Sequence, residues 1–299
     1  MMVETLPPEK NFLALEPDLS NFQKSQAVIL PVPYEASTTL MEGTQKGPEA
    51  ILAVSSHLED YDDELDVEPC SVGIATLPPV NFEGVSGEEA LKRIEIQAYK
   101  VYHTGKFLLA LGGEHTITVP LVRAAYESFD RLSVLLLDAH SDLYPEYQGS
   151  KYNHACTAAR IHDVCDFVGI GIRSSLKEQE QQLRPASRLY YANDMVRDPD
   201  WPEKVLDQLT DTVYLSIDLD FFDPAVMPAV GTPEPGGFLW YESLEFLRLL
   251  FENKNVVACD VVELCPVEGL IHPNIFAAKL VYKLIAYRFF ARISYPEKT

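Results

Sequence analysis

The amino-acid sequence predicts an α/β protein, a single three-layer αβα domain built around a mainly parallel sheet of about eight strands. Short apolar runs alternate with amphipathic stretches along almost all of the 299 residues. Each apolar run lacks the polar alternation of a half-exposed strand, so the strands are expected to be buried on both faces. No internal repeat and no linker rich in Gly, Ser or Pro divides the chain. Helices on both faces of one sheet account for these observations.

Each element follows from the spacing of its apolar residues. Strands are expected over residues 27–34, 71–77, 107–113, 132–140, 165–172, 188–192, 212–221 and 255–264. Helices are expected over residues 47–61, about 86–102, within 116–129, from near His154, and over about 201–210, 240–253 and 274–292. Residues 1–25 are less hydrophobic, and we expect them to form an N-terminal extension to a catalytic domain over 26–299.

The composition excludes several classes of protein. Acidic residues number 45 against 24 basic ones, and the net charge of -21 argues against nucleic-acid and anionic-membrane partners. This charge suits a cationic ligand, although solubility alone also explains it. No apolar run approaches the roughly 20 residues of a membrane span, and the acidic start of the chain does not read as a signal peptide. Five scattered cysteines without a CxxC pair predict reduced, buried thiols in a cytoplasmic protein.

Acidic and histidine side chains follow the expected strands at their carboxyl ends, where ligands bind in open α/β sheets. The candidate metal ligands are His115, Asp138, His140, Asp142, Asp218 and Asp220. Side chains two positions apart on a strand point the same way, so Asp138 and His140 can face one pocket, as can Asp218 and Asp220. Taken singly, each residue also suits an ordinary turn, cap or polar contact.

Four aspartates at one site would repel one another, and residues 107–122 and 132–150 contain no Lys or Arg to compensate. Divalent cations would resolve this repulsion. Six side chains are too few for two separate sites, so two ions sharing carboxylates and a water are expected. Oxygen-rich ligation without thiolate suits Mn²⁺, with Ni²⁺, Co²⁺ or Zn²⁺ as competitors. Two such ions lower the pKa of a shared water and supply hydroxide at neutral pH, which is the chemistry of a hydrolase.

The segments that carry these residues resemble the ureohydrolase family of arginase and agmatinase. They are, in family order, GGEHT (112–116), DAHSD (138–142), SIDLDFFDPAVMPAVGTPEPGG (216–237) and DVVELCP (260–266). The segment GTQKGPEAI (43–51) also resembles the N-terminal part of the family. The resemblance implies an arginase-like fold, a binuclear dimanganese centre, and the release of urea from a guanidino compound.

The resemblance also implies a role for each matching position. One metal would be held by His115, Asp138, Asp142 and Asp218, and the other by His140, Asp138, Asp218 and Asp220, with Asp138 and Asp218 bridging. Glu263 matches the acidic residue that pairs with the substrate guanidinium. His154 matches the histidine that shuttles a proton, and Asp220 would handle the proton of the attacking hydroxide.

Ordinary structural roles remain open for several of these residues. Glu263 could be a surface carboxylate at a strand end, and His154 a polar residue at the start of a helix. Asp223 precedes a proline and is interpreted as a turn former rather than a ligand. Four further histidines lie outside every motif and receive no catalytic role; they are His57, His103, His162 and His272.

The substrate expected from the sequence is agmatine, which would yield putrescine and urea in polyamine biosynthesis. Thr232 and Glu234 lie in GTPEPGG, which looks more like agmatinases than arginases, and both are expected to bind substrate. Residues 143–153, LYPEYQGSKYN, replace the stretch with which arginases would read an α-carboxylate. Glu146 and the tyrosines of this loop favour a substrate tail with an amine. Ala155 and Cys156 follow His154 where many family members have Gly-Thr or Gly-Met.

Other hypotheses stay open. Aminopropylagmatine satisfies the same reasoning, and arginine, guanidinobutyrate or guanidine would keep the mechanism. A non-catalytic metal-binding homologue is less consistent with the presence of every ligand. A two-metal phosphoesterase would need basic or amide groups that the motifs lack. The family resemblance implies a homo-oligomer, either a trimer or a hexamer.

Overall fold

A computed structural model of the chain describes residues 3–181 and 183–291. Within these residues eight strands form one sheet in which every neighbouring pair is parallel. The strands are β1 Ala27–Val32, β2 Ile74–Thr76, β3 Phe107–Gly112, β4 Leu132–Leu137, β5 Phe167–Ile172, β6 Arg188–Tyr191, β7 Thr212–Asp218 and β8 Asn255–Val262. Their order across the sheet is β2-β1-β3-β8-β7-β4-β5-β6. All eight predicted strands are confirmed.

Helices fill most connections between the strands. The α-helices are α1 Pro17–Ser20, α2 Gly47–Ser55, α3 Gly87–Tyr102, α4 Thr118–Ser128, α5 Thr157–His162, α6 Lys177–Glu180, α7 Ala192–Met195, α8 Trp201–Gln208, α9 Trp240–Asn253 and α10 His272–Phe290. The 3₁₀ helices are η1 Pro8–Lys10, η2 Phe12–Ala14, η3 Thr44–Lys46, η4 Pro69–Val72, η5 His115–Ile117, η6 His154–Cys156 and η7 Leu219–Phe221. The sequence does not predict α1, α6 and α7, because four residues are too few to show a helical period.

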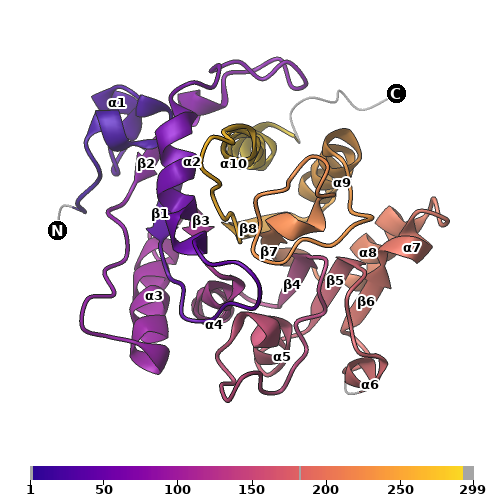
Figure 1. Cartoon of the computed structure of the whole chain (residues 1–299). Helices are drawn as coiled ribbons and strands as arrows, with labels where there is room; N and C mark the ends of the chain where they lie inside the picture. The colour runs from indigo at the N-terminus through magenta and orange to yellow at the C-terminus, as the bar shows by residue number, and fades with distance from the viewer. Residues whose placement is uncertain (1–2, 182, 292–299) are drawn as a thin grey trace, which may run out of the picture.

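The helices cover both faces of the sheet, which confirms the predicted three layers (Figure 1). Helices α2, α9 and α10 pack on one face, where Ile51 and Leu284 are fully buried. Helices α3, α4 and α5 pack on the other face, where Ile94 and Leu121 are fully buried. Burial of the sheet on both faces explains why its strands read as unbroken apolar runs.

Several predicted boundaries are wrong by a few residues. The strand predicted to reach 140 ends at Leu137, and the strand predicted to reach 221 ends at Asp218. The helix predicted over 47–61 ends at Ser55. The last helix begins at His272, and its predicted end at 292 lies outside the described residues. The two strand ends matter most, because they carry the candidate metal ligands.

The described part of the expected N-terminal extension, residues 3–25, packs on the outermost strand β2. Leu6 N donates a hydrogen bond to Thr76 O at 2.8 Å, and Asn11 Nδ2 donates to Ile74 O at 3.1 Å. Phe12 is fully buried, and its N–H donates to Thr76 Oγ1 at 3.0 Å. This segment therefore covers an edge that would otherwise expose unpaired backbone groups.

The five cysteines are all free and buried, as the sequence predicts. Among the described helices, none is long and apolar enough to cross a membrane.

The strand order brings four polar motifs of the sequence to one place. Strands β3, β8, β7 and β4 are consecutive in the sheet, although β8 comes last in the chain. The residues that follow them are His115, Glu263, Asp220 and Asp138 respectively. Since all four strands are parallel, their carboxyl ends share one edge, and these side chains can converge there.

A buried ion pair between α10 and the loop after α2 gives a test of the fold. Lys283 of α10 places Nζ 2.9 Å from Asp62 Oδ2 and 2.5 Å from Glu64 Oε2, and the side chains of Lys283 and Asp62 are only 4% and 1% exposed. We predict that Lys283→Met lowers the free energy of unfolding by about 3–5 kcal/mol, because Asp62 is left buried without a cation. Urea denaturation measures this change.

The matched control is Lys24→Met, which removes an exposed pair with Asp18. That change is expected to cost less than about 1 kcal/mol. The double variant Lys283→Met with Asp62→Asn should recover part of the lost stability. A loss for Lys283→Met no larger than that of the control would contradict the prediction.

Candidate metal centre

Three carboxylates converge on one ring nitrogen of His115. Its Nδ1 lies 3.2 Å from Asp138 Oδ2, 3.1 Å from Asp142 Oδ2 and 3.3 Å from Asp218 Oδ2. A single ring N–H cannot serve three acceptors, whereas a metal ion with bonds of about 2.0–2.2 Å to nitrogen and oxygen could be shared by this nitrogen and the oxygens around it. His115, Asp138 and Asp218 are all buried and form one group that could hold an ion.

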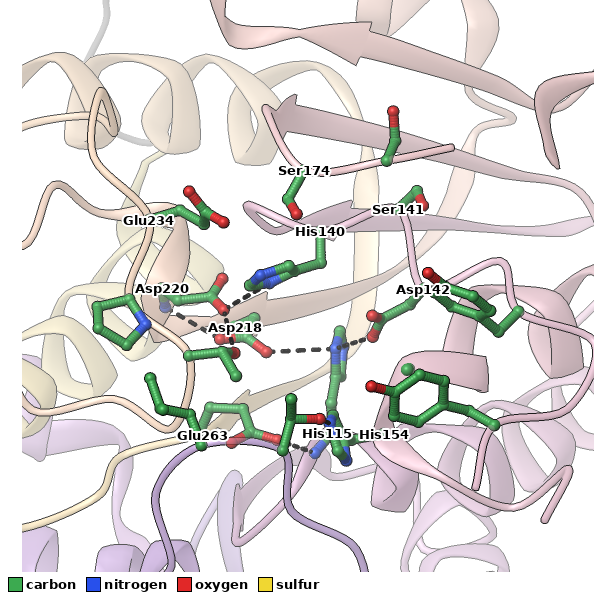
Figure 2. A pocket seen from close by; sticks show the side chains of 18 of the residues that line it. His115, His140, Ser141, Asp142, His154, Ser174, Asp218, Asp220, Glu234 and Glu263 are labelled. Atoms are coloured by element: carbon green, nitrogen blue, oxygen red, sulfur yellow. Dashed lines mark hydrogen bonds and ion pairs between the residues drawn. The ribbon is translucent and has the colours of Figure 1, made fainter. Parts of the chain in front are cut away.

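A second group lies beside the first and shares Asp138 with it. His140 Nδ1 is 2.9 Å from Asp220 Oδ2 and 3.6 Å from Asp138 Oδ1. Asp138, His140 and Asp220 therefore form a second set of possible ligands. Figure 2 shows His140 and His115 directed toward the aspartates between them. Two adjoining groups with a common carboxylate fit the expected pair of ions with a bridging ligand.

An independent observation also indicates that these side chains suit a metal ion. Asp138 Oδ2 is buried and has no hydrogen-bond donor among the described residues. An ionised oxygen in that position is costly unless a cation neutralises it. Burial raises the pKa of Asp218 well above its usual value, and the negative charges of Asp220 and Asp138 raise it further. The protein therefore holds several carboxylates that repel one another, as the sequence analysis expects.

A buried polar chain behind His115 fixes the orientation of its ring. His115 Nε2 lies 3.0 Å from Ser216 Oγ, which in turn donates to Asp260 Oδ1 at 2.7 Å. Tyr214 also donates to Asp260, at 2.6 Å. Because Nε2 is engaged on this side, Nδ1 faces the carboxylates. Histidines that bind metals commonly have their second nitrogen held in this way.

The backbone at the strand ends positions the ligands differently from the prediction. Asp138, His140 and Asp220 lie beyond the regular strands, so alternation along a strand does not align them. Instead, Asp138 Oδ1 accepts from His140 N at 2.6 Å, and Asp218 Oδ1 accepts from Asp220 N at 2.9 Å. Tight turns capped by the first aspartate of each pair bring the second residue back to the site.

Two residues at the site have left-handed backbone, which is strained for a side chain other than glycine. They are Asp142, with φ of 48°, and Glu263, with φ of 67°. A glycine at either position would adopt this backbone conformation without strain. Strained backbone of this kind persists only where the surrounding structure enforces it, and such residues cluster at functional sites.

Five of the six candidate ligands, all except Asp138, line a cavity of about 430 Å³. Its other lining residues include Glu263, His154, Thr232 and Glu234, which the sequence analysis expects at the substrate, and Ala155, one of the two departures from the family pattern. In contrast, Glu146 is exposed and does not line the cavity, whereas its neighbours Tyr144 and Tyr147 do. Among the described residues, the lining contains no Lys or Arg.

Glu263 is a buried residue of the site and not a surface carboxylate. Its side chain is 7% exposed, and its Oε1 accepts from His115 N at 2.7 Å. Burial raises the pKa of Glu263 to about 8. This carboxyl group therefore favours a cation beside it, which would restore its ionised form.

His154 begins η6 and also lines the cavity, a position that suits either of the roles left open by the sequence. Its Nδ1 is 3.0 Å from Ser37 Oγ, and its Nε2 is 2.8 Å from Thr39 Oγ1. Burial lowers the pKa of His154 to about 4, and the positive charges of His115 and His140 lower it further. The ring is thus neutral at neutral pH.

Asp223 forms a turn, as predicted, with its carboxylate accepting from the backbone N–H groups of Ala225, Gly236 and Gly237.

Sequence reasoning missed Arg173, which follows β5. Its guanidinium donates to the carbonyl oxygens of Asp220 at 2.6 Å and Glu234 at 2.8 Å. It therefore ties the turn carrying one candidate ligand to the loop carrying a candidate substrate residue. Ser37, Thr39 and Glu114 were also missed, since they lie in motifs or polar loops that give no sign of which side chains meet.

The profile of the arginase family matches residues 25–286 of the chain. The chain belongs to the arginase family. It is a metal-dependent amidinohydrolase with the binuclear type of centre found in that family, and its ureohydrolase character agrees with the sequence analysis.

Individual relatives place the chain more closely within the family. It is 38% identical to the N(1)-aminopropylagmatine ureohydrolase of Synechocystis sp., over 93% of this chain and 94% of that protein. It is 40% identical to the enzyme of the same name from Thermus thermophilus, over 88% of this chain and 90% of that protein. Among solved structures, agmatine ureohydrolase of Thermoplasma volcanium superposes with a TM-score of 0.81 at 31% identity, covering 93% and 94% of the two chains.

The shared carboxylate gives a direct test of the candidate ligands. We predict that Asp138→Asn reduces bound metal from about two ions per chain to less than one, because Asp138 belongs to both groups. Metal analysis by plasma mass spectrometry after dialysis measures the ratio. Glu146→Gln is the control, since Glu146 is exposed outside the cavity, and it should retain the wild-type content. Full metal retention by Asp138→Asn would rule out the shared ligand.

Proposed function

We propose that the chain binds two Mn²⁺ ions through the six residues named from the sequence. His115, Asp138, Asp142 and Asp218 would hold one ion, and His140, Asp138, Asp218 and Asp220 the other. The convergence of these side chains supports this set, and ligation by oxygen and imidazole without thiolate favours Mn²⁺ over structural Zn²⁺. When bound, such a pair of ions makes hydroxide available from water at neutral pH.

We further propose that the substrate is a guanidino compound whose tail carries an amine, either agmatine or N1-aminopropylagmatine. The observation that supports this is the absence of Lys and Arg from the described lining of the cavity, together with Glu234 and Glu263 in that lining. A cationic tail is compatible with these carboxylates, whereas the α-carboxylate of arginine would find no positive partner. The names of the Synechocystis and Thermus relatives favour the aminopropyl compound.

Each residue of the site would have its own role in the reaction. Glu263 would hold the planar guanidinium through charge-assisted hydrogen bonds and so fix its central carbon relative to the nucleophile. Asp220 would accept the proton released when the nucleophile adds. His154 would deliver a proton to the leaving amine, because an amine departs far more readily in protonated form. Thr232 and Glu234 would contact the rest of the substrate.

A metal-binding homologue without catalysis is the second candidate. The complete set of ligands, with Glu263 and His154 beside them, favours the enzyme. We propose that the enzyme is cytoplasmic, acts in polyamine biosynthesis and forms a homo-oligomer, a trimer or hexamer.

Urea release tests the proposed function. The Mn²⁺-loaded protein is assayed on agmatine, N1-aminopropylagmatine, arginine, guanidinobutyrate and guanidine. We expect the two amine-tailed compounds to be hydrolysed with a kcat/KM at least about tenfold above the others, equivalent to about 1.4 kcal/mol. A preference for arginine or guanidinobutyrate would discard the substrate assignment, and no urea from any compound would favour the non-catalytic homologue.

Glu234 gives a second test of the amine-tailed substrate. Glu234→Gln should raise KM for agmatine and its aminopropyl derivative about tenfold with little change in kcat, since it removes a charge from the tail and not from the reacting group. Glu146→Gln is the matched control and should leave both constants unchanged. An equal effect of the two substitutions would show that only the general negative field matters.

A further inference from the structure

The Ser37 hydroxyl lies between a buried carboxylate and the candidate proton shuttle. Its Oγ is 2.9 Å from Glu114 Oε1 and 3.0 Å from His154 Nδ1. The backbone N–H of His154 also donates to Ser37 Oγ at 3.0 Å. The three residues come from the loop after β1, the end of β3 and the start of η6, so only the fold brings them together.

Glu114 receives hydrogen bonds from every side. Its Oε2 accepts from Ala36 N at 2.6 Å and Ser37 N at 2.5 Å, and its Oε1 accepts from Thr116 Oγ1 at 2.6 Å. The side chain is 1% exposed. With Ser37 Oγ as the fourth donor, all of its acceptor positions are filled, which is the bonding pattern of an ionised carboxylate. The proton of the Ser37 hydroxyl therefore points toward Glu114.

The direction of that one bond fixes the others. A serine hydroxyl has one proton to donate and two lone pairs to accept with. Since Ser37 donates to Glu114, both lone pairs are available to His154, one for its backbone N–H and one for its ring Nδ1. The ring nitrogen at this position must then carry the proton. In a neutral imidazole, the other nitrogen, Nε2, is left with a lone pair.

The loop that carries Ser37 is held at both ends. Glu35 accepts from Gly43 N at 3.0 Å and Gln45 N at 2.9 Å, which closes the loop on itself. Cys265, two residues beyond Glu263, donates from Sγ to Glu42 O at 3.3 Å. Ser37 is thus placed by a built structure and not by a chance contact. Thr39 of the same loop lines the cavity, and its Oγ1 lies 2.8 Å from Nε2 of His154.

We infer that Ser37 and Glu114 are positioning residues that hold His154 in its Nδ1-protonated tautomer, with Nε2 unprotonated and facing the hydroxyl of Thr39, which lines the cavity. The inference rests on the proposed function in one respect, the proton transfer assigned to His154. In that reaction Nε2 would accept the proton that Asp220 has taken from the nucleophile and would give it to the leaving nitrogen as the C–N bond breaks, so that the ring returns to its neutral form. Glu114, through Ser37, stabilises the ring while it carries the extra charge.

The tautomer itself can be observed without any assay of activity. Full-length protein with ¹⁵N-labelled histidine, loaded with diamagnetic Zn²⁺, is studied by long-range ¹H–¹⁵N spectroscopy, and His154 is assigned by comparison with His154→Ala. We expect a protonated, pyrrole-type Nδ1 and an unprotonated, pyridine-type Nε2. The opposite pattern in the wild-type protein would overturn the inference.

Glu114→Gln makes the sharper variant, because it should reverse the chain of hydrogen bonds. The amide oxygen of Gln can still accept from the two backbone N–H groups, which leaves its NH₂ group facing Ser37. Ser37 would then accept from the amide and donate to His154, so the ring proton moves to Nε2. Retention of the Nδ1-protonated form in Glu114→Gln would contradict the relay.

Kinetics separate a positioning role from a merely structural one. We expect Ser37→Ala to lower kcat about tenfold with KM changed less than about twofold, and Ser37→Thr, which keeps the hydroxyl, to recover most of the loss. His154→Ala should lower kcat about a hundredfold, in the range of general acid–base catalysis. In that background Ser37→Ala should add less than about twofold, because Ser37 acts through His154. Full additivity of the two losses would contradict the inference.

Ser71→Ala is the matched control, since Ser71 is an exposed serine on η4 whose hydroxyl donates to the nearby Glu68 O. It should change neither kcat nor the tautomer. Failure of the proposed function would appear as no urea from any guanidino compound, whatever the tautomer. Failure of the relay would appear as normal urea release with an unchanged tautomer in Ser37→Ala and Glu114→Gln.

Discussion

Asp138, Asp142 and Asp218 direct carboxylate oxygens at one imidazole nitrogen from a distance of 3.1–3.3 Å, in a region shielded from water. Such a cluster is stable only if cations offset the repulsion, because no Lys or Arg of the described residues lines the cavity. Much of the surrounding architecture serves this arrangement. The strained backbone of Asp142 and Glu263, and the Ser216–Asp260 chain behind His115, hold side chains that would otherwise move apart.

The sequence predicted the sheet well because burial leaves a strong signal. A strand covered by helices on both faces can hold only apolar residues, so each of the eight strands stood out as an unbroken run. The general rule that ligands bind at the carboxyl ends of parallel strands then located the site. The order of the strands in the sheet could not be predicted from the sequence, because β8, the last strand in the chain, lies between β3 and β7. Only the family resemblance linked His115 to Asp218.

The residues that the sequence could not reveal act through contacts between distant loops. Ser37 and His154 are 117 positions apart, and Arg173 meets the Glu234 carbonyl across 61 positions. Polar loops have no periodicity from which such pairs could be inferred. Glu146 is a different case, since a negative charge in this loop suggested substrate contact, whereas the residue is exposed and is not part of the cavity lining. Composition indicates the sign of a field, and geometry decides which carboxylates reach the ligand.

Charge balance explains how one site can hold metals and still select a cation. Under the proposed centre, two divalent ions bring four positive charges, and the carboxylates of Asp138, Asp142, Asp218 and Asp220 offset them while the histidines stay neutral. Glu263 and Glu234 then add further negative charge to a cavity whose described lining has no Lys or Arg. A guanidinium at Glu263 and an amine at Glu234 would neutralise both, whereas arginine would bring its carboxylate toward Glu234 as well. Selection by this means requires no residue dedicated to rejecting arginine, because the glutamate that attracts an amine also repels the carboxylate of arginine's zwitterionic tail.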